Sequence, residues 1–316
     1  MISNRRCFIT GIKSTKLNKK EVNFLKKYKP WGIILFSRNI KTISQTQKLT
    51  HQIKSIFKDR NYPILIDEEG GKVSRLNKFI DSTIFTAEFF GNLYKKDKKK
   101  FNIYYNVYIK QISYLLNLLG ININTVPVLD VRRKFTNNVI GNRSFSTNSS
   151  LVSSMGKICI QKFHENHIGT IIKHIPGHGL STDDSHLKLT SIKHNYKLLN
   201  KVDFSPFKKQ RAFLAMTAHV IYKSIDPNNS ATHSKKIMKI IRKKIAFKNI
   251  IMSDDISMKA LKYSISENTT RAFNAGCNLV LHCNGNFKEM LIVAKNSPLL
   301  NNFVIKKTSQ LTNIIR

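Results

Sequence analysis

The stretch "NIIMSDD" (residues 249–255) shows the pattern that decides the fold. A short apolar run without polar alternation, ending in polar residues, is typical of a β-strand that is buried on both faces. Seven similar runs occur at residues 7–12, 31–37, 62–67, 121–130, 169–174, 213–221 and 278–283. The segments between them are amphipathic, and we predict helices at residues 44–57, 101–119, 148–165, 235–246 and 267–276.

Eight strands that alternate with helices predict an α/β fold, a (β/α)₈ TIM barrel. A doubly wound open sheet remains the alternative, because alternation along the chain does not distinguish the two. The chain has no Gly/Ser-rich linker, composition break or internal repeat, which predicts one domain over residues 1–316. The barrel is favoured because polar residues follow the apolar runs, and in a barrel these strand ends share one rim. These residues are Asp67, Asp130, Lys173, His174, His219, Asp254 and Asp255.

The composition is strongly basic, with 54 Lys+Arg against 18 Asp+Glu and a net charge of +36. This charge is spread over the whole chain, and its densest run, "YKKDKKK" (94–100), is typical of a solvated surface between helices. No zinc finger, helix-turn-helix or aromatic-interleaved RNA motif occurs. We therefore expect no specific nucleic-acid partner, while attraction to acidic substrates or anionic surfaces stays open.

The chain shows no signal peptide and no apolar run of transmembrane length. Its four cysteines have no CxxC spacing, which indicates free thiols in a reducing compartment. These features predict a cytoplasmic protein without a membrane partner. Nothing in the sequence requires more than a monomer.

The segment "LIDEEGGKVSRL" (65–76) places an acidic cluster and a Gly-Gly pair after a predicted strand. It is not a phosphate loop, because the carboxylates repel phosphate and the spacing of such loops is absent. Asp67 can accept hydrogen bonds from neighbouring sugar hydroxyls, and the Arg75 guanidinium can donate to their oxygens. A capping carboxylate and a surface arginine explain this segment equally well.

Asp254 and Asp255 follow the run that opens this section. A carboxylate at the rim of a pocket can act as a nucleophile or as a base. From this segment alone, a cap of the following helix is the favoured role for one of the two.

The segment "IIKHIPGHGLSTDDSH" (171–186) contains three histidines and two aspartates, but its proline and glycines exclude a helix. A zinc site formed by His174, His178, Asp184 and His186 is geometrically open, although no HExxH-like scaffold holds such ligands. Asp184 and His186 are two residues apart, so in extended backbone they point the same way. The carboxylate can then orient the imidazole for proton transfer, or the two can form a solvent-facing pair.

Together these segments resemble the single-domain β-N-acetylhexosaminidases of glycoside hydrolase family 3, bacterial enzymes that trim N-acetylglucosamine from recycled cell-wall muropeptides. "KHIPGHG" (173–179) followed by "DSH" (184–186) is specific to this branch. The other matching segments keep the family's order from about residue 30 to 285: "GIILFSRN", "IDEEGGKVSRL", "VPVLDV", "IGNRSF", "TAHVIY" and "FKNIIMSDDISMKAL".

The resemblance implies a (β/α)₈ barrel and a metal-free, cofactor-free glycosidase that acts on a small carbohydrate. It implies Asp254 as the nucleophile and His186 as the general acid/base, oriented by Asp184. The positions that match the family's N-acetylglucosamine-binding residues are Asp67, Arg75, Arg143, Lys173 and His174.

The chain departs from the family at Glu68, where Gln is usual, and at Lys72, where Arg is common. Residues 286–316 match nothing in the family that indicates a role. Two other classes remain open: a metallohydrolase that uses the histidine cluster, and a basic, non-catalytic barrel that binds polyanions.

Overall fold

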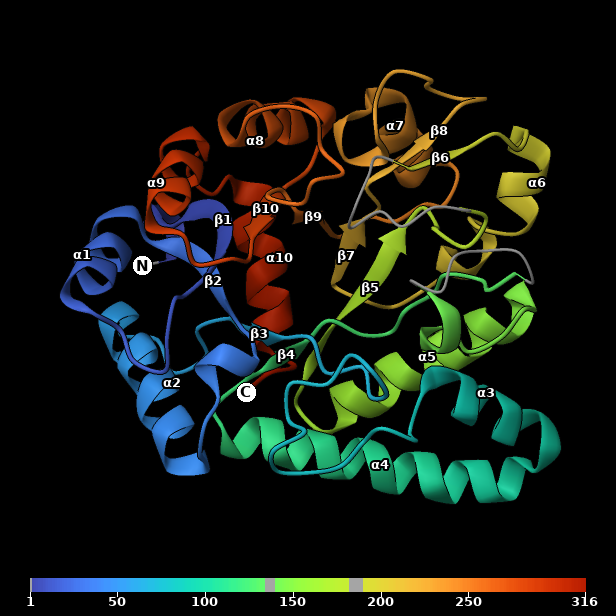
Figure 1. The fold of residues 1–316 in the computed structure, drawn as a ribbon, viewed down its shortest axis with the longest axis horizontal. Helices are drawn as coiled ribbons and strands as arrows, with labels where there is room; N and C mark the ends of the chain where they lie inside the picture. The colour runs from blue at the N-terminus through green and yellow to red at the C-terminus, as the bar shows by residue number, and fades with distance from the viewer. Residues whose placement is uncertain (1, 134–139, 182–189) are drawn as a thin grey trace.

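The computed structural model describes residues 2–133, 140–181 and 190–316. Its centre is a closed barrel of eight parallel strands (Figure 1), which confirms the predicted TIM barrel and excludes the open sheet. In order around the barrel the strands are β1 (Arg6–Gly11), β2 (Pro30–Leu35), β3 (Ile64–Ile66), β4 (Ile123–Asn124), β5 (Gly169–Ile175), β7 (Leu214–Thr217), β9 (Ile250–Asp255) and β10 (Leu279–His282).

Helices form the outer layer around these strands (Figure 1). The five predicted helices are present, with ends that differ from the predicted ones by at most three residues. The fifth predicted helix ends at Ala275 and is followed by Gly276, whose positive φ of 119° ends the helix as predicted. The helices are α1 (Lys19–Tyr28), α2 (Ile43–Phe57), α3 (Ala87–Lys96), α4 (Lys98–Leu118), α5 (Ser149–Glu165), α6 (Tyr196–Lys201), α7 (Lys235–Lys243), α8 (Ile265–Ala275), α9 (Phe287–Asn296) and α10 (Asn302–Thr312).

Two of the predicted strands differ in the structure. The run 213–221 is split: β7 ends at Thr217, and β8 (Val220–Tyr222) leaves the barrel to pair with β6 (Thr190–Ile192). An apolar run does not reveal this break, because both parts are buried. The run 121–130 contributes only Ile123–Asn124 to a named strand, since Pro127 has no N–H to donate to the ladder.

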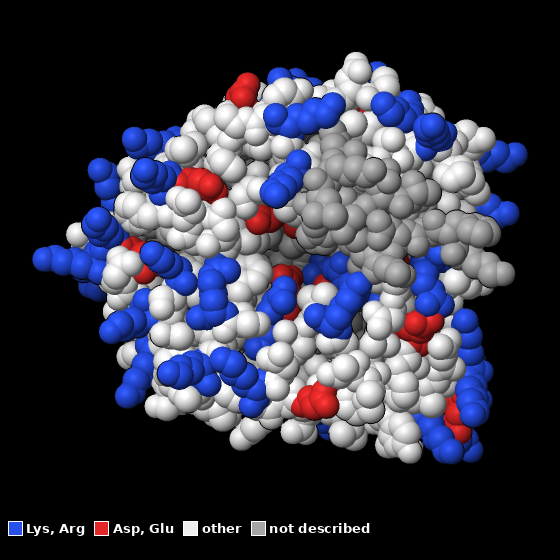
Figure 2. Space-filling model, in the orientation of Figure 1, with Lys and Arg blue, Asp and Glu red and all other residues white. Residues whose placement is uncertain are grey.

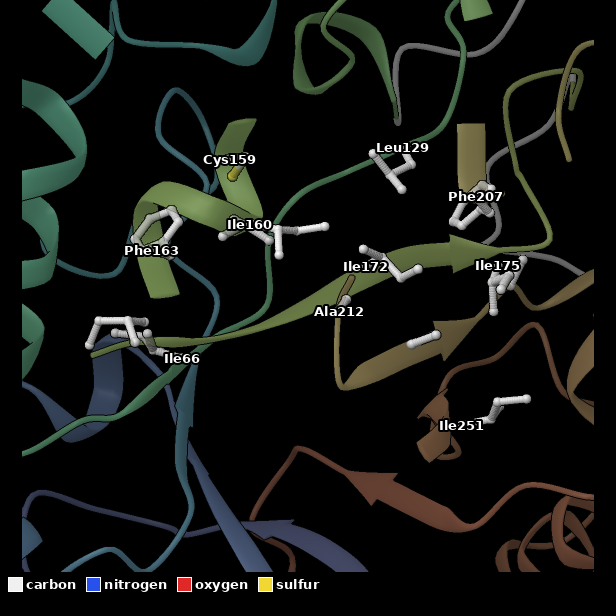
Figure 3. Close-up of a cluster of buried hydrophobic side chains, with 14 of the residues drawn as sticks. Ile66, Leu129, Cys159, Ile160, Phe163, Ile172, Ile175, Phe207, Ala212 and Ile251 are labelled. Atoms are coloured by element: carbon white, nitrogen blue, oxygen red, sulfur yellow. The ribbon is translucent and has the colours of Figure 1, made fainter. Parts of the chain in front are cut away.

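Successive residues of the barrel strands face two separate apolar cores. On β5, Ile171 points into the barrel, whereas Ile172 points outward and packs in the layer beneath the helices. Figure 3 shows part of this outer layer, where α5 contributes Cys159, Ile160 and Phe163. Because both faces of the sheet are covered, near-continuous apolar runs were the correct strand signal.

Helix α10 explains the C-terminal residues that the sequence left without a role. Its Val304 and Leu311, with Leu300 before it, belong to the same apolar cluster as the inward-facing strand residues. The Trp31 indole N–H on β2 donates a hydrogen bond of 2.8 Å to Thr308 of α10. In Figure 1 α10 lies near the centre of the ring, and these contacts place it across the amino ends of the strands.

Lys and Arg are scattered over the whole visible face of the molecule rather than gathered in one patch (Figure 2). Within the described ranges, no helix combines the length and apolarity that crossing a bilayer requires.

Candidate active site

Lys173 of β5 forms the centre of a buried ion cluster at the carboxyl ends of the strands. Its Nζ lies 3.2 Å from Oδ1 of Asp67 and 2.7 Å from Oε1 of Glu69, and it donates to the Thr125 hydroxyl at 2.8 Å. Only 3% of the lysine side chain is exposed. A buried ammonium is tolerated here because two carboxylates and a hydroxyl replace its hydration.

Glu69 ties Lys173 to Arg143 across the pocket. Arg143 lies in the short helical turn Gly141–Arg143 and binds Glu69 with two hydrogen bonds, of 2.7 and 2.8 Å. Burial raises the pKa of Glu69, but Arg143 and Lys173 outweigh it and hold the pKa well below its usual range. Glu69 was not predicted as a site residue, although its place in "IDEEGG" could have indicated one. Glu69 keeps two neighbouring cations fixed and prevents their mutual repulsion.

Asp67 follows β3 and faces the cluster from the other side. The Arg75 guanidinium lies 3.6 Å from its Oδ2. Burial raises the pKa of Asp67, but Lys173 and Arg75 lower it by a larger amount. The net pKa lies below its usual value, so the carboxyl is ionised at neutral pH. Asp67 and Arg75 therefore lie together in the pocket. This excludes the alternative in which Asp67 only caps a helix and Arg75 lies apart from it on the surface.

Glu68, the residue that departs from the family, is 1% exposed and turns away from this pocket. Its carboxylate accepts from the backbone N–H groups of Arg75 and Leu76 at 2.7 and 3.0 Å and from the Ser74 hydroxyl at 3.1 Å. Burial raises its pKa. Glu68 thus shapes the loop that presents Arg75. Lys72, the second departure, lines the pocket itself and is exposed.

Asp130 orients His174. It is fully buried, and its Oδ2 accepts a hydrogen bond of 2.7 Å from the imidazole Nδ1. It also accepts from the backbone N–H of His178 at 2.7 Å. With Nδ1 bonded to this carboxylate, Nε2 of His174 faces Oδ2 of Asp254 at 4.0 Å. Burial raises the pKa of Asp130, but the two histidines outweigh it.

Asp254 and Asp255 have different environments although they are adjacent on β9. Asp254 faces the pocket, and its Oδ1 accepts the Asp255 backbone N–H at 2.7 Å. Burial raises the pKa of Asp254, but His219 and His174 lower it to a value below the ordinary one. Asp255 accepts from Ser257 at 3.0 Å and from the Cys283 N–H at 3.2 Å. The predicted helix cap was wrong: Asp255 caps a turn, because α8 begins only at Ile265 with Ser264 as its own cap.

Most of these groups, but not Glu68, Asp130 or Asp255, line one pocket of about 270 Å³. It contains every predicted site residue that the structure describes, together with residues that the sequence analysis did not assign. Met216 and Leu281 add apolar surface from β7 and β10, which no sequence pattern distinguished from ordinary core. Two larger hollows, of about 610 and 650 Å³, are lined by outer helices and loops rather than by strand ends. The predicted residues in the 270 Å³ pocket are Asp67, Arg75, Arg143, Lys173, His174 and Asp254.

Asp184 and His186 lie outside the described residues. The described residues on either side of this segment, Ser181 and Thr190, are both buried, and their hydroxyls are 2.8 Å apart. Among residues 2–133, 140–181 and 190–316, no group of three or more His, Cys, Asp or Glu has the arrangement of a metal site. His174 of the hypothetical zinc set is instead bonded to Asp130.

Comparison with known proteins agrees with this arrangement. The model of the glycosyl hydrolase family 3 N-terminal domain matches residues 6–313. A β-hexosaminidase of Haemophilus ducreyi is 31% identical over 288 residues, which cover 87% of this chain and 80% of that protein. Native NagZ from Neisseria gonorrhoeae, whose crystal structure is known, is 28% identical in sequence and superposes with a TM-score of 0.86. The match covers 99% of this chain and 90% of the NagZ chain.

The gonococcal NagZ has also been solved in complex with N-trifluoroacetyl-D-glucosamine and with a zinc ion. These structures are 28% and 27% identical to this chain, with TM-scores of 0.85 and 0.84. Each match covers 98% of this chain and 90% of the NagZ chain. With the family model matching nearly the whole chain, and with charged strand-end residues gathered in one pocket, the protein belongs to glycosyl hydrolase family 3 and is a glycosidase.

Proposed function

We propose that the protein is a retaining exo-β-N-acetylglucosaminidase that removes terminal N-acetylglucosamine from muropeptides during peptidoglycan recycling. The names of its relatives support a hexosaminidase, and the glucosamine derivative bound to the gonococcal NagZ supports an N-acylated sugar. One observation of this chain carries the proposal: Asp254 lines the same pocket as the polar residues of β3 and β5 and the loops after them.

The polar wall of the pocket suits a sugar ring. Asp67 accepts hydrogen bonds from hydroxyl groups, while Arg75, Arg143 and Lys173 donate to sugar oxygens. His174 donates or accepts through the Nε2 that faces Asp254. Because Glu69 and Asp130 already hold three of these groups in place, little side-chain entropy remains to be lost when the sugar binds.

Catalysis then proceeds by double displacement. The Asp254 carboxylate attacks C1 while His186, as imidazolium, gives its proton to the departing glycosidic oxygen. The resulting glycosyl-enzyme ester is opened by water, and neutral His186 takes the proton of that water. Net retention follows from two inversions at C1. The lowered pKa of Asp254 supports this role, because only the ionised carboxylate is a nucleophile.

The roles of His186 and Asp184 rest on the family resemblance. Asp184 stabilises the imidazolium form of His186 and so supplies the acid of the first step. The contact between Ser181 and Thr190 supports this assignment, because Ser181 is bonded to the His178 carbonyl and Thr190 pairs with Val220 of β8, just after His219. General acids of glycosidases are commonly carboxylic acids, so the dyad is the least usual part of the proposal.

We also propose that residues 1–316 act as one domain and as a monomer in the cytoplasm. The packing of α10 inside the apolar cluster of the barrel supports a single folding unit. Four free cysteines, three of them buried, are in keeping with a reducing compartment.

The decisive experiment is hydrolysis of matched β-N-acetylglucosaminide and β-glucoside substrates, with the product followed by proton NMR. We expect preference for the N-acetylglucosaminide and initial release of the β-anomer. Initial release of the α-anomer would exclude the covalent intermediate on Asp254. Equal rates on both substrates would exclude the sugar specificity.

A further inference from the structure

His219 occupies a buried position next to the proposed nucleophile and outside the lining of the pocket. It follows β7 and is 1% exposed. Both ring nitrogens have a partner: Nδ1 lies 2.8 Å from the Thr232 hydroxyl, and Nε2 lies 3.0 Å from the carbonyl oxygen of Asp255. The imidazole thus connects the loop after β8 to the backbone immediately after Asp254.

The partners of His219 determine which nitrogen carries the proton. A carbonyl oxygen only accepts, so Nε2 must be the donor to Asp255. In a neutral ring Nδ1 is then the acceptor, so the single hydroxyl proton of Thr232 goes to Nδ1 at 2.8 Å rather than to the more distant Ala218 carbonyl at 3.3 Å. Burial lowers the pKa of His219, which agrees with a neutral ring. The Thr232 hydroxyl is itself buried and lies 2.8 Å from the hydroxyl of Thr217.

The bond from His219 reaches Asp254 through one residue of backbone. Nε2 holds the carbonyl of Asp255, and the N–H of Asp255 donates to Oδ1 of Asp254 at 2.7 Å. The Asp255 side chain is fixed separately by Ser257 and the Cys283 N–H. Asp255 is therefore held on both sides, and its N–H sets the direction of the Asp254 carboxylate, whose Oδ2 faces His174.

We propose that His219, locked by Thr232 as the neutral Nε2–H tautomer, is a positioning residue that aims Asp254 at the anomeric carbon through the backbone of Asp255. This inference rests on the proposed function, because it takes Asp254 as the nucleophile. A neutral ring still positions the backbone through its N–H. The other groups that lower the pKa of Asp254, His174 and the Asp255 N–H, do not depend on a charge on this ring.

Two substitutions at His219 separate hydrogen bonding from packing. His219→Leu removes the donor, whereas the amide nitrogen of His219→Gln reaches about as far as Nε2 and keeps it. We expect kcat/KM on a nitrophenyl N-acetylglucosaminide to fall about 10²-fold in the Leu variant, as for a misplaced reacting group. The Gln variant should recover most of this loss. The inhibition constant of free N-acetylglucosamine should stay within about twofold, since the sugar-binding residues are untouched.

His164 offers a matched control. Its Nε2 lies 3.0 Å from the Thr170 hydroxyl, so it forms the same kind of His–Thr pair outside the pocket. His164→Leu should leave kcat/KM unchanged. Thr232→Val should lower kcat/KM by about tenfold. Thr232→Ser should keep the wild-type value, because only serine retains the hydroxyl.

Nitrogen-15 NMR of histidine-labelled wild-type protein tests the tautomer directly, because the protein that is measured carries no substitution. The signal of His219 is assigned by its absence from the spectrum of His219→Gln. We expect a neutral ring with the proton on Nε2 throughout the range in which free histidine titrates. An imidazolium, or a proton on Nδ1, would overturn the inference.

Two kinetic outcomes would also overturn it. One is a folded His219→Leu variant with wild-type kcat/KM. The other is a parallel loss of activity and inhibitor affinity, which a purely structural role would produce. Asp254→Ala is measured in the same series: if that variant retains turnover, the proposed function fails. If it loses turnover while His219→Leu does not, only the present inference fails.

Discussion

At its amino end the barrel is filled by apolar side chains and covered by α10, whereas at its carboxyl end the same strands enclose ionised ones. Trp31, Leu311 and Ile123 belong to the first region, and Lys173, Glu69 and Asp254 to the second. Burying apolar surface stabilises the fold directly. Burying charges costs desolvation, which neighbouring cations outweigh at Glu69 and Asp67. The comparison indicates that stability and catalysis are assigned to opposite ends of one sheet.

The largest effect should come from Asp254→Ala at the carboxyl end. We expect turnover to fall roughly 10⁴-fold or more, since the covalent step is lost. The melting temperature should fall only slightly, because the Asp254 side chain is 21% exposed and its nearest cationic partner, His174, lies 4.0 Å away. Initial rates on a chromogenic N-acetylglucosaminide and thermal unfolding measure the two effects. The exposed carboxylate of Asp81 provides the control, and Asp81→Ala should leave both unchanged. Wild-type turnover in the Asp254→Ala variant would contradict the assignment of catalysis to this end of the barrel.

His186→Ala should give the next largest loss. General acid catalysis contributes about 10²–10⁴-fold, so a glycoside with a poor leaving group should be cleaved that much more slowly. A dinitrophenyl leaving group needs little protonation, and its departure should be slowed far less. Rates on the two substrates are compared for wild type and variant. Equal losses on both would show that His186 is not the acid.

Leu311→Ala tests the amino end. Leu311 is fully buried in the barrel cluster, and its truncation should lower the free energy of unfolding by about 2–5 kcal/mol. The kcat of the folded variant should be unchanged, because α10 lies across the opposite end from the pocket. Urea denaturation and active-site-normalised rates provide the readouts. A kcat loss in fully folded protein would show that the two ends are coupled.

Acid should lower the free energy of unfolding through the buried histidines at the carboxyl end. Burial lowers the pKa of His178 to about 4 and also lowers that of His219. The unfolded chain binds protons at these histidines near pH 6.5, so their contribution is complete above about pH 6.5 and falls as the pH drops toward about 4. For His178 alone we expect a loss of about 2 kcal/mol between about pH 7.5 and about pH 5.

Urea denaturation at the two pH values measures this loss. His178→Asn should reduce the pH dependence, whereas Leu311→Ala should shift stability equally at both values. An unchanged pH dependence in His178→Asn would show that other groups cause the acid sensitivity.

The smallest expected effect is that of a metal chelator. The proposed double displacement needs no metal ion, so activity should be the same before and after treatment with EDTA. Loss of activity that zinc restores would favour the metallohydrolase and would assign His178 and His186 a different role.

Much of the site could be predicted because its residues lie directly after apolar runs. Asp67, Lys173, His174 and Asp254 were identified in this way, Arg75 from its place eight residues after Asp67, and Arg143 through the family segments. Roles were harder to predict than places. Nothing in "SDD" shows that Asp254 faces the pocket while Asp255 holds a turn, because that depends on where Cys283 of the next strand lies.

The roles of the supporting residues were missed for the same reason, although Asp130 and His219 had been placed at strand ends. Glu69 and Asp130 act on partners 74 and 44 residues away, respectively, and His219 on a carbonyl 36 residues away. Helix α10 resembled any amphipathic segment, and only its contacts show that it covers the barrel.

The sequence by itself determined the strands, the helices and the rim, because burial on both faces and chain alternation are written in local apolar patterns. Only the tertiary structure decided which carboxylates are paired, which is free to react and which histidine nitrogens carry protons. Those properties depend on distances between residues remote in the chain, and ionisation responds to the charges and burial that folding brings together.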